Sequence, residues 1–191
     1  GKLWFKVPSS MKFVLNGRLS KGVYSKDVIL EVIARIGTDG ALYKAMEFVG
    51  DSLKYMSMEA RMTITNMAIE AGGKNGIIGF DDTTKQYLDK HLKDKKDYTV
   101  YKSDPDAKYE SVLEIDCSKL EPMVAMPHLP SNGAPIGDCK GKPMDQAYIG
   151  SCTNGRMEDL RIAAKIFKGR QAAIRTLVVP ATPTHESLNT R

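Results

Sequence analysis

Hydrophobic and polar positions near the end of the chain repeat with two different periods. Residues 146–149 form a short apolar run typical of a strand, and residues 174–179 form a second one. Between the two runs, one helical face collects Met157, Leu160, Ala164 and Phe167. Thr153 or Asn154 is expected to cap this helix and Gly169 to end it. The pattern predicts a β-α-β crossover, in which functional side chains gather beyond the carboxyl ends of the strands.

The rest of the chain predicts further helices and strands in alternation. Strands are expected over residues 12–16, 76–80 (a buried strand) and 112–115. Helices are expected from the cap Ser25 to Gly37, over residues 42–49, from the cap Ser57 to Gly72, and over residues 85–92. This order of elements places the chain in the α/β class, with mixed sheets flanked by helices.

Proline and glycine suggest where one domain gives way to the next. Residues 121–143 contain five prolines among glycines and polar residues, which favours a connection over regular structure. We therefore expect a middle α/β domain over residues 25–120 and the start of another over residues 144–191. Residues 1–24 are then expected to end a preceding domain, so the chain contains parts of more than one α/β domain.

Composition narrows the possible functions only moderately. The chain has 191 residues, 42% of them hydrophobic and 27% charged, and a formal net charge of +5. Its lysines are dispersed, and acidic residues interrupt the densest run at residues 90–97, so nucleic-acid binding is not favoured. Neither a signal peptide nor a membrane-spanning segment is expected from these residues. A cytoplasmic protein is the expectation.

Cysteine and histidine usage points to one residue. The three cysteines have no regular spacing, so no disulfide framework is expected. His91, His128 and His185 have no partner at ligand spacing, which argues against zinc or mononuclear iron. Cys152 lies in the turn between the strand and the helix of the crossover, where backbone N–H groups stabilise a thiolate. It is a candidate metal ligand, although a lone cysteine is commonly a small buried side chain.

The residues around Cys152 resemble a known motif. Residues 148–161, YIGSCTNGRMEDLR, are similar to the cysteine motif of the aconitase superfamily, and within it to the large subunits of isopropylmalate dehydratase and homoaconitase. Residues 1–8 resemble the segment that leaves the first domain of that family. Residues 57–72 resemble its mid-chain helix. The resemblance covers nearly all of the chain and implies an aconitase-like fold.

The resemblance also implies a cofactor. In this family three cysteines bind a [4Fe–4S] cluster, whose fourth iron binds the substrate hydroxyl and carboxylate. Cys152 matches the first of these cysteines. The other two form a C-x-x-C further along the family's chain that is missing here, and Cys117 and Cys139 match neither. One thiolate cannot bind a cubane cluster, so we expect an internal fragment in which the cluster is absent or incomplete.

Further site residues follow from the same resemblance. Asn66 and Glu70 are four residues apart on a predicted helix, so their side chains are expected to point the same way. In the family this asparagine lies near the cluster and this glutamate contacts the water and substrate side of the open iron. Four residues flank the cysteine and are expected to bond the sulfur or a substrate carboxylate, or only to form the turn: Ser151, Thr153, Asn154 and Arg156.

The function implied is that of a hydro-lyase. The intact large subunit would interconvert 2-isopropylmalate and 3-isopropylmalate in leucine biosynthesis, together with a small subunit in a heterodimer or heterotetramer. This chain alone would be inactive. Homoaconitase, which acts on another di- or tricarboxylate, is the alternative that these residues do not separate. A non-catalytic scaffold or binding module of aconitase-like fold remains open because the C-x-x-C is missing.

Overall fold

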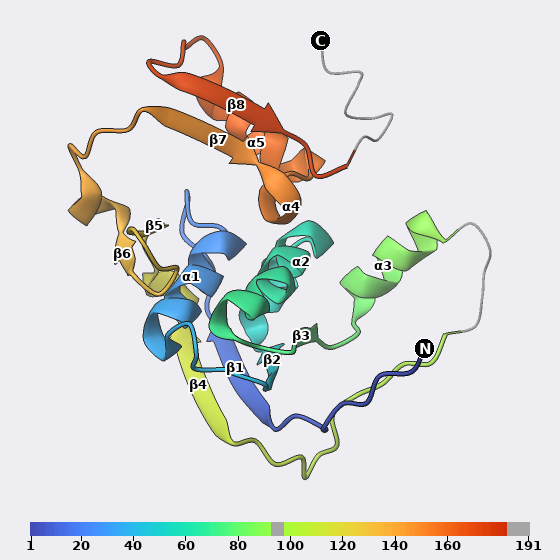
Figure 1. Cartoon of the computed structure of the whole chain (residues 1–191). Helices are drawn as coiled ribbons and strands as arrows, with labels where there is room; N and C mark the ends of the chain where they lie inside the picture. The colour runs from blue at the N-terminus through green and yellow to red at the C-terminus, as the bar shows by residue number, and fades with distance from the viewer. Residues whose placement is uncertain (93–97, 183–191) are drawn as a thin grey trace. The chain divides into compact units, whose positions relative to one another are not determined.

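The chain folds into two compact units, Gly1–Cys139 and Lys140–Arg191, in a computed structural model that describes residues 1–92 and 98–182 (Figure 1). His185 and the rest of the tail from residue 183 lie outside the described residues. Both units contain parallel strands joined through helices, and the first adds an antiparallel pair. The expected α/β class with mixed sheets is confirmed. Within the described residues no helix is both long and apolar enough to cross a membrane.

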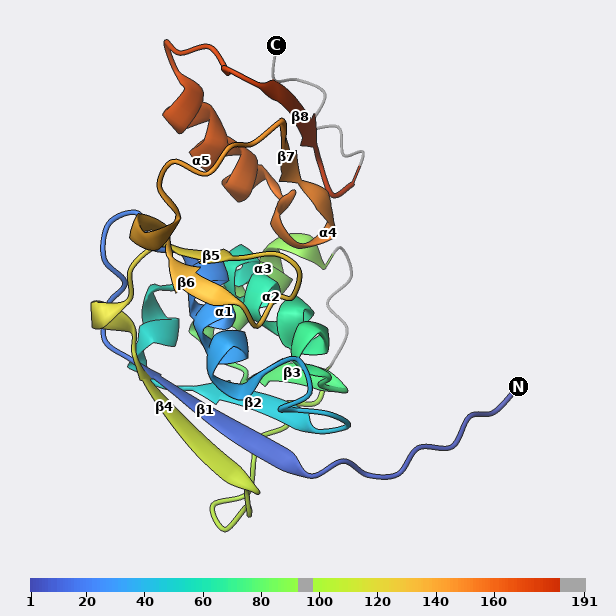
Figure 2. The ribbon, with the colours of Figure 1, turned by 60° about the vertical axis from the view of Figure 1, so that its left-hand side comes forward.

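The first unit is built on a parallel sheet with the strand order β3-β2-β1-β4. Its strands are β1 (Ser10–Asn16), β2 (Ala45–Val49), β3 (Asn75–Ile78) and β4 (Ser111–Asp116). The unit also contains the helices α1 (Ser25–Ile36), α2 (Met58–Asn66) and α3 (Asp82–His91). Figures 1 and 2 show α1 and α2 on the same face of the sheet.

The core of this unit lies between the sheet and these two helices. Phe13 of β1 and Phe48 of β2 are fully buried, and their rings stack with centroids 5.1 Å apart. Ile29 and Ile33 of α1 and Ile64 of α2 are also fully buried. The alternation along β1 and the helical spacing along α1 therefore direct their apolar residues into one shared core.

Two predicted elements differ from the structure. Residues 42–49 were expected to be helical, but Ala45–Val49 form β2, which pairs with both β1 and β3. Met46 and Phe48 are fully buried there, so pairing and burial override a helical pattern of moderate propensity. The predicted buried strand is β3, which lies at the edge of the sheet and leaves Ile77 44% exposed.

The predicted helix from Ser57 to Gly72 changes form before its end. Ser57 caps α2 as expected, because its hydroxyl accepts a hydrogen bond from the Ala60 N–H at 3.1 Å. After Asn66 the chain tightens into a 3₁₀ segment, η2 (Met67–Ala71). A 3₁₀ segment has about three residues per turn, so the regular i,i+4 relation expected for Asn66 and Glu70 does not apply.

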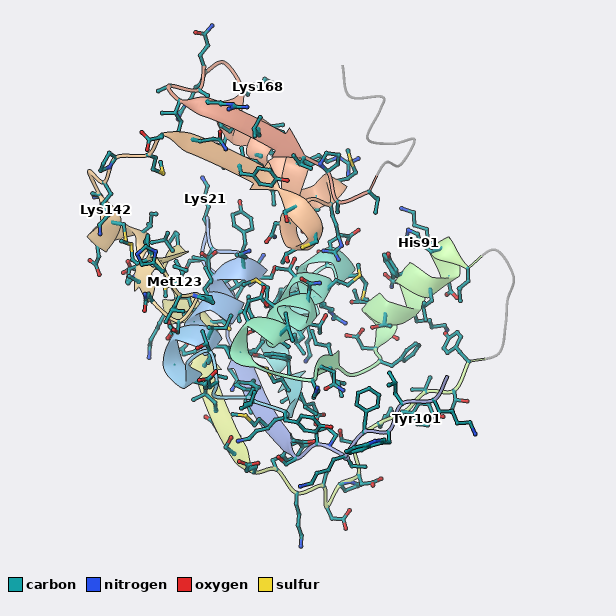
Figure 3. All side chains as sticks on the ribbon, in the orientation of Figure 1. Lys21, His91, Tyr101, Met123, Lys142 and Lys168 are labelled. Atoms are coloured by element: carbon teal, nitrogen blue, oxygen red, sulfur yellow. The ribbon has the colours of Figure 1, made fainter. Side chains whose placement is uncertain are left out.

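The segment expected to be an irregular connection forms a small hairpin. β5 (Met123–Ala125) pairs antiparallel with β6 (Gly133–Pro135). The Met123 N–H donates to the Asp27 carboxylate of α1 at 2.7 Å, and Figure 3 labels Met123 at this hairpin. Contacts with α1, which sequence spacing does not reveal, therefore order a stretch rich in proline.

The second unit contains the predicted crossover. β7 (Gln146–Gly150) pairs in parallel with β8 (Arg175–Val179), and α5 (Met157–Phe167) connects them. A separate single turn, α4 (Ser151–Asn154), precedes α5. Because this turn uses Thr153 and Asn154, neither residue caps α5 as predicted. The cap is Arg156, whose N–H donates to the Asp159 carboxylate at 3.1 Å.

An ion pair between a buried arginine and an exposed aspartate joins α2 to the start of α3. The guanidinium of Arg61, only 2% exposed, donates from Nη1 and Nη2 to the two carboxylate oxygens of Asp81, each at 2.7 Å. Asp81 also caps α3, because its Oδ1 accepts from the Thr84 N–H at 3.0 Å. These hydrogen bonds, with Arg61 first, lower the pKa of Asp81 from 3.8 to about 2.

We predict that Asp81→Asn weakens the fold at neutral pH and has little effect near pH 2. A lowered carboxyl pKa stabilises the folded state above pH 3.8, and this stabilisation is lost as pH falls through about 2. Because the Asp81 side chain is 43% exposed, solvent screening reduces the effect to about 1 kcal/mol. Urea unfolding of the wild-type and Asp81→Asn proteins between pH 2 and 7 measures the difference in their free energy of unfolding. A difference that does not change with pH would contradict the lowered pKa of Asp81.

Candidate functional site

The turn after β7 places Cys152 by means of an unusual backbone. Gly150 has φ 112° and Ser151 has φ 82°, both in the region that favours glycine. A Cβ on Gly150 would lie 1.9 Å from the carbonyl oxygen of Val179 at the end of β8. Only glycine therefore allows the two strand ends to approach this closely. The parallel pairing of β7 and β8 thus determines where Ser151 and Cys152 lie relative to the end of β8.

Cys152 is exposed, and hydroxyl groups flank its thiol. The Ser151 hydroxyl lies 3.6 Å from Sγ and the Thr153 hydroxyl 3.9 Å from it. These contacts, with Ser151 first, lower the pKa of the Cys152 thiol. The sequence predicted that this thiol lies at the start of the long helix. Cys152 lies instead in the single turn α4, because α5 begins only at Met157. The two hydroxyls contribute most to the lowered pKa of this thiol, and the backbone N–H groups of Cys152 and Thr153 lower it further.

The other expected residues of the turn have defined partners. The guanidinium of Arg156 donates to the Thr153 carbonyl at 2.9 Å, so this side chain stabilises the turn. Asn154 donates from Nδ2 to the Asp159 carboxylate at 3.0 Å. Its Oδ1 is buried, and the described part of the chain offers it no hydrogen-bond partner. An unpaired buried acceptor costs free energy, which is why such groups are often found where a ligand binds.

Asp159 is the residue of this turn that sequence reasoning missed. Its carboxylate accepts from both the Asn154 side chain and the Arg156 N–H. The available signal was the spacing of three residues between a helix cap and an acidic residue, which is typical of capping boxes. The expected cap at Thr153 or Asn154 put the helix start in the wrong place and concealed it.

Asn66 and Glu70 lie in the first unit, at the junction of α2 and η2. Asn66 is exposed, whereas Glu70 is half-buried. One carboxylate oxygen of Glu70, Oε2, is buried and has no hydrogen-bond partner among residues 1–92 and 98–182. A carboxylate oxygen in this state can accept a hydrogen bond. The structure thus groups the candidate residues in two sets, one in each unit.

The remaining cysteines and the described histidines do not join either set. Cys117 is fully buried in the core, and its burial raises the pKa of its thiol. Cys139 is half-buried, with its Sγ 3.2 Å from the Met126 sulfur. His91 lies at the carboxyl end of α3 (Figure 3), where its ring stacks on Tyr87. His128 is exposed in the loop between β5 and β6.

An iron–sulfur cluster fits this chain only in part. An accessible thiol with a lowered pKa suits one thiolate ligand, and Cys152 provides it. A cubane cluster requires several cysteine ligands. Among the described residues no group of three or more His, Cys, Asp or Glu side chains could bind a metal ion.

Comparison with known proteins identifies one family. The model of the aconitase family (aconitate hydratase) matches residues 1–143 and 137–187. The 3-isopropylmalate dehydratase large subunit of Syntrophus aciditrophicus is 55% identical over 184 residues, which cover 95% of this chain and 43% of the relative. The corresponding subunit of Clostridium beijerinckii is 53% identical with the same coverage. That of Endomicrobium trichonymphae is 56% identical over 186 residues, or 96% of this chain and 44% of the relative.

We predict that Ser151→Ala makes Cys152 less reactive at neutral pH. Loss of the nearest hydroxyl removes the main cause of the lowered thiol pKa, so less thiolate is present. Alkylation of Cys152 by iodoacetamide at pH 7, followed by mass spectrometry, should slow by roughly a factor of two or more. Ser118→Ala, which removes a hydroxyl that bonds Asp116 in the first unit, is the control. Equal rates in Ser151→Ala and wild type would refute the role of the hydroxyl.

Proposed function

Because the chain belongs to the aconitase family, we propose that it is part of the iron–sulfur large subunit of a 3-isopropylmalate dehydratase. This hydro-lyase interconverts 2-isopropylmalate and 3-isopropylmalate, a step of leucine biosynthesis, by removing and re-adding water. The similarity to large subunits of that name over 95% of this chain is the observation that carries the proposal. The chain spans less than half the length of those relatives, so the activity is assigned to the intact subunit.

Cys152 is proposed as one of three thiolate ligands of a [4Fe–4S] cluster. Its exposure and its lowered pKa support this role, since a ligand must be accessible and deprotonated. When bound, the cluster supplies an iron that acts as a Lewis acid on the substrate hydroxyl. The other two thiolates are assigned to polypeptide outside residues 1–191. Gly150 positions this ligand, because a residue without a side chain lets the turn lie close to the end of β8.

Glu70 and Asn66 are proposed to act on the substrate side. The unpaired Oε2 of Glu70 suits a carboxylate that takes a proton from water or returns it. The neutral amide of Asn66 can donate a hydrogen bond without adding charge, which suits a position beside an anionic cluster.

The residues around Cys152 are proposed to orient it and to contact the substrate. Ser151 and Thr153 present hydroxyls to the sulfur, and Arg156 stabilises the turn through the Thr153 carbonyl. The unpaired Oδ1 of Asn154 is an acceptor available to a substrate hydroxyl. A dicarboxylate substrate also suits a chain with a net charge of +5.

The intact subunit is proposed to work with a small subunit in the cytoplasm. The relatives are named large subunits, which implies a smaller partner in the same enzyme. Thiolate ligands remain reduced in the cytoplasm, where a cluster of this kind is compatible with the redox conditions. Neither nucleic acid nor a membrane is part of the proposal.

We expect Cys152→Ala in the intact subunit to prevent cluster assembly. The protein would be reconstituted anaerobically with iron and sulfide, and its iron and sulfide content and absorption spectrum measured. Cys139→Ala, which removes a half-buried thiol of the first unit, is the matched control and should load normally. Equal cluster content in Cys152→Ala and wild type would disprove the ligand assignment.

Assays with the small subunit present, using isopropylmalate and homocitrate in parallel, identify the substrate.

We expect Glu70→Gln to slow the reaction without emptying the site. Replacing the carboxylate by an isosteric amide removes proton transfer, which is worth about 10²–10⁴-fold in rate. Cluster content should equal that of wild type, so that kcat for isopropylmalate measures the chemistry alone. Glu114→Gln changes an exposed carboxylate on β4 and should leave kcat unchanged. A Glu70→Gln enzyme with wild-type kcat would remove Glu70 from the mechanism.

A further inference from the structure

Arg61 is the largest fully buried side chain of the described structure, and it lies on the helix that leads to the candidate site. Besides the two bonds to Asp81, its Nη2 donates to the Leu53 carbonyl at 2.8 Å. Leu53 belongs to the 3₁₀ segment η1 (Asp51–Tyr55), and Asp81 caps α3. One guanidinium therefore joins three elements: η1, α2 and α3. A planar fork makes these bonds in a fixed geometry that an ammonium group cannot reproduce.

Packing on this side of α2 is incomplete. A pocket of about 280 Å³ lies between α2, β3 and the start of α3. It is lined by Met58, Met62, Ile77 and Ile78, together with Arg61, Thr65, Gly76 and Thr84. Side chains that face an open space make few contacts there and fix a helix poorly. The Arg61 bonds are directional contacts that link α2 to η1 and to the start of α3.

The position of α2 determines where the candidate residues lie. Asn66 is the last residue of α2, five residues after Arg61 and about 7.5 Å further along the helix axis. Glu70 follows in η2, which continues directly from α2. A shift or rotation of α2 at Arg61 is carried to Asn66 at its end, and through the continuous backbone to Glu70 in η2.

We propose that Arg61 is a positioning residue for the hydration reaction, acting through its fork to Asp81 to place Asn66 and Glu70. The inference rests on the proposed function, since it assigns a role in the same site. A displacement of about 1 Å at a reacting group can cost 10²-fold in rate, so a helix anchor of this kind matters for turnover. Arg61 itself does not touch the substrate in this proposal.

The test compares Arg61→Lys, which keeps the charge but loses the fork, with wild type in the intact subunit and its partner. Cluster content should be unchanged, kcat should fall about tenfold or more, and KM should change little. Arg35→Met is the matched control, because it removes an arginine that pairs with Glu31 on the exposed side of α1. Unchanged kcat in Arg61→Lys, or an equal loss in Arg35→Met, would overturn the proposal.

A second readout on the 191-residue chain does not depend on activity. Met67 lies between Asn66 and Glu70 in the sequence, and its side chain is buried. Its methyl resonance in the NMR spectrum should shift in Arg61→Lys. The methyl of Met11 in β1 should not shift. If the wild-type enzyme hydrates no acid tested, the proposed function fails while the Met67 shift still supports the anchor. If stability falls but Met67 does not shift, Arg61 is structural only and the inference fails.

Discussion

The close approach of the ends of β7 and β8 is the constraint on which the candidate metal ligand depends. Parallel pairing brings the Val179 carbonyl so near to Gly150 that no side chain fits between them. The chain leaves β7 through two residues with positive φ, and Cys152 follows at once. Its exposure and its hydroxyl neighbours are consequences of this turn, so its chemistry is set by backbone geometry before any ligand binds.

In the first unit, side-chain hydrogen bonds contribute to the position of the helix α2, which ends at Asn66. Its core is conventional, with a parallel sheet covered by α1 and α2, yet the far side of α2 borders a pocket. There the buried guanidinium of Arg61 bonds the exposed Asp81 carboxylate and the Leu53 carbonyl. The planar fork of the guanidinium fixes the direction of these bonds. Asn66 ends the same helix, and Glu70 lies in η2 directly after it.

Much of the fold could be predicted from the sequence, and the exceptions are informative. Alternation along residues 12–16 and the helical period from Ser25 to Gly37 gave correct elements, because each pattern matches the face that is buried. The helix predicted over residues 42–49 was wrong, because a short apolar run is compatible with a helix or a strand until its neighbours in the fold are known. The hairpin within residues 121–143 depends on Asp27, about a hundred positions earlier.

For the site, the sequence by itself determined the residue types and the family, because the motif around Cys152 is contiguous and a glycine turn is local chemistry. It predicted Asn66 and Glu70 on one face of a single helix, whereas Glu70 lies in the 3₁₀ segment η2 that follows α2. Only the tertiary structure decided that Arg156 and Asp159 serve the turn and that Arg61 joins three elements. It also showed that one buried oxygen of Glu70 has no hydrogen-bond partner in the part of the chain that the structure describes. These depend on which distant groups meet, which no local pattern encodes.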